Sequence, residues 1–173
     1  MKNILLSLMA VTLLALTTYA AAKTKSSKNP KLSVGDTAPN FILPNENNKP
    51  VEFHAVKGKK VLYFYPMDKT PGCTKQACSL RDGYKDLQAK GITVLGISYD
   101  SVESHAKFKQ DKNLPFSLLS DVKKEVSKLY HTSGMFFTDR VTFLVDESNK
   151  IVKILKNISL KDHADQVTRE FRI

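Results

Sequence analysis

Arginine is scarce in this sequence, at only four of 173 residues. The net charge of +10 at pH 7 therefore comes mainly from lysines, which are spread along the whole chain and do not alternate with aromatic residues. A nucleic-acid-binding surface usually concentrates its basic residues and adds stacking aromatics. We therefore expect solvated surface charge and no nucleic-acid partner, with only weak attraction to acidic partners or anionic surfaces.

Long hydrophobic runs are also absent, apart from one near the N-terminus. Residues 4–16 are almost all apolar, Lys2 precedes them, and the small residues 20–22 follow them. A basic start, an apolar core and a small-residue end are typical of a secretory signal peptide. The run is shorter than the ~20 residues that a membrane-spanning helix needs. Cleavage is therefore favoured over the alternative, an uncleaved membrane anchor.

We expect residues 1–22 to be this cleavable signal peptide, with cleavage after Ala20 or Ala22. No cysteine lies near the cleavage point, which argues against a lipid-anchored N-terminus. The predicted location is the bacterial periplasm, with a eukaryotic secretory route as the alternative. No stable membrane association is expected after cleavage.

The chain has no internal repeat and no linker that would divide it. Residues 23–31 are basic and polar and hold no side chain suited to a core, as in segments that stay unfolded. We expect a flexible basic tail over residues 23–32. The remaining residues, 33–173, suit one domain with a core of ordinary size.

Hydrophobic patterning predicts the order of helices and strands. Two short strands at 41–43 and 51–53 form a hairpin, and nearly continuous apolar runs at 61–65 and 92–98 indicate strands buried on both faces. The remaining elements are helices at 73–90, 101–112, 121–130 (with Val122, Val126 and Leu129 on its apolar face) and 160–171, a strand at 116–119, and a hairpin of 141–145 with 151–155. This order predicts an α/β fold, a thioredoxin-like sandwich with an extra N-terminal β-hairpin.

Cysteine occurs only twice, as Cys73 and Cys78. In an exported protein, a structural disulfide is one interpretation. If both residues lie on the helix predicted at 73–90, their Cα atoms are roughly 8–9 Å apart, whereas a disulfide tolerates less than ~7 Å. The pair must then stay reduced, or the first turns of the helix must unwind when the bond forms. A bond that unfolds its own helix is a poor structural support but a reasonable redox switch.

Cys73 lies where a buried strand has ended and a helix begins. Open α/β sheets usually place their functional sites at this end of the strands, and the unpaired N–H groups and dipole of a helix N-terminus favour an anion. The thiolate, which is the reactive form, is therefore stabilised at Cys73. Pro71 and Gly72 hold the turn, and Gly72 lets the backbone approach a small substrate. The hydroxyl of Thr70 can cap the helix, contact a substrate, or do both.

These residues resemble the active-site motif of the peroxiredoxin family, Pro66-x-x-x-Thr70-x-x-Cys73. The longer run from Phe64 to Cys78 is similar to the Q-type branch, also called bacterioferritin comigratory protein. Similarity extends to residues 35–41, 96–101, 114–121 and 140–146, so the resemblance covers nearly all of the chain that follows the predicted signal peptide.

The resemblance implies a thiol peroxidase in which Cys73 attacks a peroxide oxygen and becomes a sulfenic acid, which Cys78 resolves as an intramolecular disulfide. Thr70 would hydrogen-bond the peroxide. Arg140 would stabilise the thiolate and the charge that moves as the O–O bond breaks; taken alone, it would be an ordinary surface arginine at a strand end. Pro66 would shield Cys73 from water and over-oxidation, although a proline can equally just end a strand.

The family also implies a monomer, a peroxide substrate, an external dithiol reductant such as a thioredoxin-like protein, and no haem, flavin or metal cofactor. The chain departs from it at Gln76, where many Q-type members carry Glu, and in a shorter segment between Tyr130 and Arg140. Residues 135–137 in that segment, Met-Phe-Phe, either pack in the core or widen the substrate range toward lipid and alkyl hydroperoxides. Export is a further departure, since many relatives are cytoplasmic, and an exported enzyme cannot be reduced directly by cytosolic thioredoxin.

Two other functions stay open for a thioredoxin-like scaffold. A dithiol–disulfide oxidoreductase acting on proteins usually carries Cys-x-x-Cys, and two more residues separate the cysteines here. A copper or zinc carrier would use both thiols and a histidine, but the histidines lack the spacing of metal ligands. Each is therefore expected at the surface or as a hydrogen-bonded core residue: His54, His105, His131 and His163.

Overall fold

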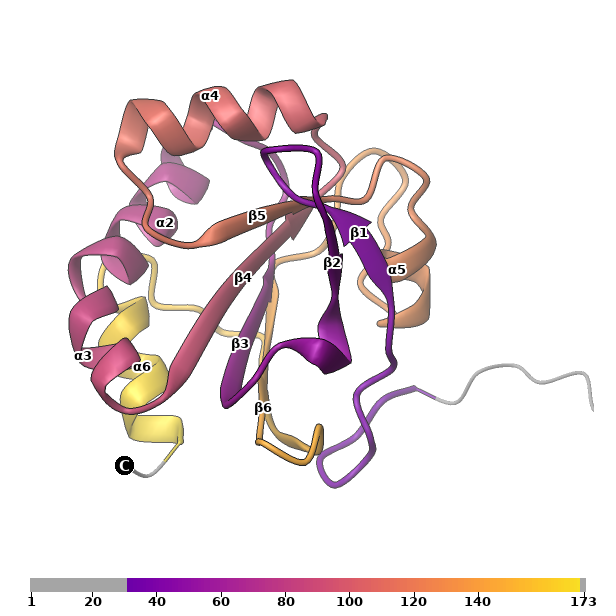
Figure 1. The fold of residues 1–173 in the computed structure, drawn as a ribbon, viewed down its shortest axis with the longest axis vertical. Helices are drawn as coiled ribbons and strands as arrows, with labels where there is room; N and C mark the ends of the chain where they lie inside the picture. The colour runs from indigo at the N-terminus through magenta and orange to yellow at the C-terminus, as the bar shows by residue number, and fades with distance from the viewer. Residues whose placement is uncertain (1–30, 172–173) are drawn as a thin grey trace, which may run out of the picture. The chain divides into compact units, whose positions relative to one another are not determined.

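A five-stranded mixed sheet organises residues 31–171, the part of the chain that the computed structural model describes. The predicted signal peptide (1–22) and residues 23–30 of the predicted tail lie outside the described residues. The strands lie in the order β5-β4-β3-β6-β7, and Figure 1 labels the first four of these. Their bounds are β3 Lys59–Phe64, β4 Ile92–Ser98, β5 Ser117–Ser120, β6 Val141–Val145 and β7 Ile151–Leu155.

Helices join the parallel strands β3, β4 and β5, as parallel pairing requires. α2 (Pro71–Asp82) and α3 (Tyr84–Ala89) connect β3 to β4, and α4 (Val102–Lys112) connects β4 to β5. The remaining elements are the hairpin of β1 (Ile42–Pro44) and β2 (Pro50–Glu52), the 3-10 turn η1 (Phe53–Ala55), α5 (Glu125–Leu129) and α6 (His163–Glu170). This is the α/β sandwich with an N-terminal hairpin that the sequence predicts.

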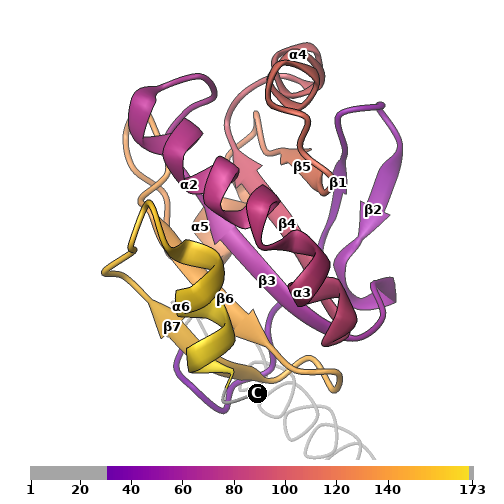
Figure 2. The same ribbon diagram turned by 90° about the vertical axis from the view of Figure 1, so that its left-hand side faces the viewer.

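Two apolar layers pack on opposite faces of the sheet, because alternate residues of a strand point to opposite faces. Val61 and Tyr63 of β3 pack in the layer formed with α2, α3 and α6, which lie in front of the sheet in Figure 2. Leu62 and Phe64 pack in the other layer, with the N-terminal segment and α5. β3 is therefore buried on both faces, which explains its nearly continuous apolar sequence.

The helix predicted at 73–90 is divided in two at Gly83. A Cβ atom at Gly83 would lie 2.5 Å from the Cβ of Ala164 on α6. Glycine therefore allows α6 to approach at this point, and it is also a poor residue for a helix interior. The split leaves both cysteines on α2 alone.

The helix predicted at 121–130 is shorter, because α5 begins only at Glu125. Asp121 remains outside it, where its carboxylate accepts hydrogen bonds from the backbone N–H groups of Val126 and Ser127. A side chain outside a helix that accepts hydrogen bonds from the first N–H groups of that helix fixes the residue at which the helix begins. The prediction that Val122 belongs to the apolar face is wrong, since it is 56% exposed. The last helix is likewise shorter than the predicted 160–171.

The register of β3 and β6 brings Arg140 close to the start of α2. Antiparallel pairing sets Phe64, the last residue of β3, opposite Val141, the first residue of β6. Arg140 therefore lies at the carboxyl edge of β3, where the chain turns through Pro66 toward α2. Most of the predicted site residues gather at this edge.

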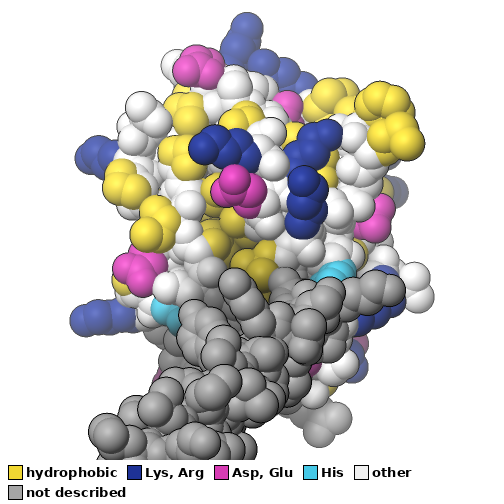
Figure 3. All heavy atoms as spheres, turned by 90° about the vertical axis from the view of Figure 1, so that its right-hand side faces the viewer, with side chains coloured by type: hydrophobic (Ala, Val, Ile, Leu, Met, Phe, Trp, Pro, Cys, Tyr) yellow, Lys and Arg dark blue, Asp and Glu magenta, His cyan; other side chains and the backbone are white. Residues whose placement is uncertain are grey.

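The surface of the described residues carries dispersed charge. On the face shown in Figure 3, Lys and Arg side chains are interspersed with apolar, acidic and neutral ones. This distribution agrees with the expectation of solvated surface charge. Within residues 31–171, no helix is both long enough and apolar enough to cross a membrane.

Candidate active site

Cys73 lies in the first turn of α2, and only 2% of it is exposed. The N–H groups of a first helical turn have no acceptor within the helix, so they and the helix dipole create positive potential near the sulfur. In addition, the Nη2 group of Arg140 donates a hydrogen bond to Cys73 Sγ at 3.2 Å. Two independent sources of positive potential therefore act on one sulfur atom.

Cys78 lies on the same helix and is partly buried, and both cysteines are free thiols. The expectation that the two residues share a continuous helix is confirmed. Residues five positions apart on such a helix are too distant for a disulfide. Any bond between Cys73 and Cys78 therefore requires α2 to unwind.

Thr70 occupies the N-cap position of α2, but its side chain does not cap the helix. The hydroxyl instead donates to the carbonyl oxygen of Met67 at 3.1 Å. Because this hydroxyl makes no hydrogen bond to the first N–H groups of α2, the capping role considered from the sequence is wrong. The contact with Met67 uses the hydroxyl proton and leaves the oxygen as an acceptor. Pro66 lines a groove together with residues 134–140, which include Phe137 and Arg140.

A chain of buried polar groups continues from Arg140 into the protein. Its Nη1 group donates to Gln76 Oε1, Gln76 Nε2 lies 3.1 Å from His163 Nδ1, and His163 Nε2 lies 3.2 Å from Thr142 Oγ1. Burial, followed by the positive charge of Arg140, lowers the pKa of His163 to about 4. The sequence did not indicate that His163 and Thr142 connect to this site, because no local pattern links Gln76 with a residue 87 positions away.

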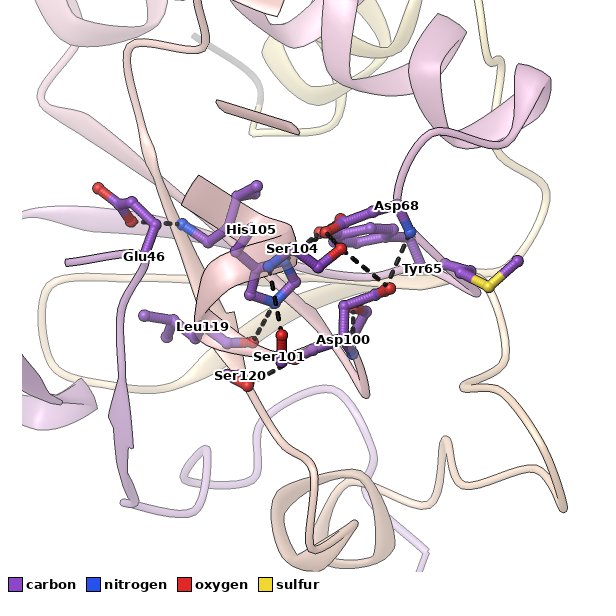
Figure 4. Close-up of polar contacts among 12 residues, drawn as sticks. Glu46, Tyr65, Asp68, Asp100, Ser101, Ser104, His105, Leu119 and Ser120 are labelled. Atoms are coloured by element: carbon purple, nitrogen blue, oxygen red, sulfur yellow. Dashed lines mark hydrogen bonds and ion pairs between the residues drawn. The ribbon is translucent and has the colours of Figure 1, made fainter. Parts of the chain in front are cut away.

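The loop that carries Thr70 is anchored by the buried carboxylate of Asp68, shown in Figure 4. Asp68 accepts hydrogen bonds from the hydroxyls of Tyr65 at 2.7 Å and Ser104 at 2.8 Å, and His105 Nδ1 lies 3.0 Å from it. Burial alone would raise the pKa of Asp68, but the hydrogen bond and charge of His105, with the other donors, hold that pKa below its usual value. The backbone N–H of Asp68 also donates to Asp100, so the loop is tied to the start of α4.

The ligand-type atoms of Asp68, Asp100 and His105 lie within 4.8 Å of one another, a grouping that the sequence spacing did not reveal. Each of these residues already has protein partners. Asp100 accepts from Ser98 at 2.6 Å, and the second ring nitrogen of His105 lies 3.2 Å from the carbonyl oxygen of Leu119. The arrangement is therefore a hydrogen-bond network that fixes the loop, and His105 and His163 are hydrogen-bonded core residues, as expected.

Residues 135–137 lie on the surface beside the same groove. Met135 is 80% exposed, Phe136 72% and Phe137 48%, so the alternative that they pack in the core is wrong. Thr138 fixes this loop, because its hydroxyl donates to the carbonyl oxygen of Tyr65 at 2.7 Å, at the end of β3. An apolar surface therefore adjoins the cysteine site.

Known proteins are similar to this chain in sequence or structure. The AhpC/TSA family matches residues 34–154. "Putative peroxiredoxin bcp" of Coxiella burnetii is 43% identical over 145 residues, which cover 79% of this chain and 96% of that protein. The structure of peroxidoxin BcpB from Mycobacterium tuberculosis has a TM-score of 0.78 and 32% identity, covering 82% of this chain and 97% of that one.

A further solved structure is the bacterioferritin comigratory protein of Xanthomonas campestris, studied for its alkyl peroxide reduction activity. Its TM-score is 0.73 at 25% identity, with 82% of this chain and 96% of that one covered. These matches confirm the predicted thioredoxin-like α/β fold.

The burial of a neutral His163 makes stability depend on pH. An unfolded histidine binds a proton near pH 6.5, whereas folded His163 does so only near pH 4. Between these values the unfolded state binds one more proton than the folded state, so the free energy of unfolding falls as the pH falls. The slope reaches about 1.4 kcal/mol per pH unit. Denaturant unfolding across this range should show a steeper loss of stability in the wild type than in His163→Asn, and equal slopes would contradict it.

Proposed function

Because the chain belongs to the AhpC/TSA family and is a peroxiredoxin, a thiol peroxidase, we propose that it reduces hydrogen peroxide and organic hydroperoxides through Cys73 and resolves the oxidised residue with Cys78. The observation that carries this proposal is the 3.2 Å contact between the Arg140 guanidinium and Cys73 Sγ. It joins two side-chain features that the first step needs, a nucleophilic sulfur and a fixed positive charge.

In the first step the Cys73 thiolate attacks one peroxide oxygen. An S–O bond forms, the O–O bond breaks, and the second oxygen leaves with the electron pair and takes up a proton as water or an alcohol. Cys73 becomes a sulfenic acid, so the sulfur is oxidised by two electrons and the peroxide is reduced. Arg140 stabilises the thiolate and then the charge on the departing oxygen. The Thr70 hydroxyl oxygen is available to accept the peroxide proton.

In the second step the sulfur of Cys78 attacks the sulfenic sulfur. An S–S bond forms and water leaves, so that both cysteines end in one disulfide. Because both residues lie on α2, the first turns of that helix must unwind first. An intact helix favours the peroxide reaction, and an unwound helix favours resolution.

An external dithiol then reduces the disulfide and is itself oxidised to a disulfide. A monomer suffices for this cycle, since one helix of one chain holds both cysteines. If the enzyme is exported, the dithiol belongs to a thioredoxin-like protein of the same compartment. The two alternatives, a protein disulfide oxidoreductase and a metal carrier, are not favoured. In the described residues 31–171, the one group of metal-type ligands contains neither cysteine.

The proposed roles of the two cysteines predict the stoichiometry of thiol loss. Reduced wild-type protein mixed with one equivalent of hydrogen peroxide in a stopped-flow instrument should lose both thiols rapidly. Cys73→Ser should lose none at that rate, since it lacks the nucleophile, and Cys78→Ser should accumulate a sulfenic acid that dimedone traps. A wild type that reacts no faster than a free thiol would refute the peroxidase function, and fast thiol loss in Cys73→Ser would refute the assignment of the nucleophile.

The exposed apolar residues beside the groove predict a preference among peroxides. The Xanthomonas protein's alkyl peroxide activity and the exposure of Phe136 and Phe137 support contact with an apolar substrate tail. Replacing Phe136 and Phe137 by Ala should lower the ratio of the cumene hydroperoxide rate to the hydrogen peroxide rate by about tenfold. Ile42→Ala, an exposed apolar change in β1, serves as the control. An unchanged ratio in the double variant would rule out this contact.

Export is proposed from the N-terminal sequence, with the periplasm as its destination. Expression of the full chain in a Gram-negative bacterium should yield a protein in the periplasmic fraction whose intact mass begins after Ala20 or Ala22. Recovery of the full-length mass, or of the protein in the cytoplasm alone, would contradict this location without bearing on the peroxidase activity.

A further inference from the structure

The guanidinium of Arg140 carries donors only, and this fixes the orientation of each group behind it. Gln76 must turn its acceptor Oε1 toward Arg140, so its donor Nε2 faces His163. Nδ1 of His163, 3.1 Å away, must then accept this hydrogen bond. The ring proton is therefore on Nε2, which donates to Thr142 Oγ1 at 3.2 Å. A single neutral tautomer of His163, protonated on Nε2, is therefore compatible with all three hydrogen bonds from Arg140 to Thr142.

We propose that His163 is a positioning residue of this site, which acts through the Gln76 amide to hold the Arg140 guanidinium against the Cys73 sulfur. His163 lies on α6, 90 residues after Cys73 in the sequence, and it does not touch the reacting atoms. This role rests on the proposed function and extends it, because it assigns part of the thiolate-stabilising geometry to a helix outside the peroxiredoxin motif.

The three hydrogen-bonded side chains behind Arg140 are fully buried, so the orientation of each is strongly determined. Gln76, Thr142 and His163 are each 0% exposed, and a buried amide left without hydrogen-bond partners is strongly unfavourable. Turning the Gln76 amide by half a rotation would place its NH₂ group against the guanidinium. Protonation of His163 would also break the arrangement. Its Nδ1 would then carry a hydrogen that faces the NH₂ group of Gln76, so that two donors would oppose each other. The Tyr63 ring packs edge-on to the imidazole at 6.3 Å and restricts its plane.

The neutral amide at Gln76 has an electrostatic consequence. A carboxylate in this place would pair with Arg140 and reduce the positive potential at Cys73. The amide orients the guanidinium without cancelling its charge, and the ion pairs found among residues 31–171 do not include Arg140. The charge of Arg140 therefore acts on the sulfur undiminished by a counter-ion, provided that the amide is held in its orientation.

Two conservative variants of His163 separate its two hydrogen bonds. In His163→Asn the side-chain oxygen can take the place of Nδ1 and accept from Gln76. In His163→Gln the amide reaches the place of Nε2 and keeps the Thr142 contact but not the Gln76 contact. We expect His163→Gln to show a smaller thiolate fraction at neutral pH, read from ultraviolet thiolate absorbance, and a rate with hydrogen peroxide lower by about five- to tenfold. His163→Asn should restore most of both.

Val167→Ala is the matched structural control, because Val167 is a fully buried residue of α6 one turn after His163. It should lower stability without changing the thiolate fraction or the rate. Thr142→Val leaves His163 in place but removes the acceptor that holds the ring proton on Nε2. The imidazole can then carry its proton on Nδ1, where it cannot accept from Gln76, an option that Asn at this position does not have. Thr142→Val should therefore move both readouts in the same direction as His163→Gln, and it serves if His163→Gln does not fold.

Equal loss of rate in His163→Asn and His163→Gln, or a loss in Val167→Ala that matches them, would overturn the positioning role. A wild type that is inert to peroxide would refute the proposed function instead. In that case the thiolate fractions of the same variants still decide whether His163 positions Arg140.

Discussion

The contact between the Arg140 guanidinium and the Cys73 sulfur is the interaction on which the rest of the site depends. The two residues are far apart in the sequence, so the fold must bring them to this contact. Cys73 is placed by the start of α2, and Arg140 by the pairing of Phe64 with Val141 across β3 and β6. Because a slip of one residue would turn β6 over, the sheet register is itself part of the active site. The polar chain from Gln76 into α6 then determines how the guanidinium is turned.

In the proposed mechanism, α2 must meet two opposite requirements. While intact, it holds Cys73 beside Arg140 and in its own first turn, where the helix dipole favours an anion. To bring Cys78 to the same sulfur, it must unwind. The break at Gly83 limits this change to one short helix, because α3 is separately fixed by the buried Leu87. The Asp68 network on the preceding side keeps the Thr70 loop attached to α4. The stability of α2 therefore sets the balance between the two steps.

Sequence reasoning predicted what local patterns encode. The bounds of β4, β6 and β7 match the predicted strands. β4 and β6 are nearly continuous apolar runs that are buried, whereas β7 is partly exposed and was predicted as the second strand of a hairpin. The failures concern tertiary contacts. Gly83 breaks a predicted helix where Ala164 packs against it, and Val122 is exposed because α5 begins later than its apolar spacing indicates. The bond of Gln76 to His163 joins residues with no local relation, so only the fold reveals it.

The most direct test is the rate of reaction of reduced protein with hydrogen peroxide in the wild type and in Arg140→Met. Removal of one preorganised charged donor from the reacting atoms should lower the rate constant by about 10²–10³-fold, while Arg169→Met, a loss of an exposed guanidinium on α6, should leave it unchanged. If Arg140→Met reacts as fast as the wild type, the guanidinium does not stabilise the reacting sulfur, and the site works by other means.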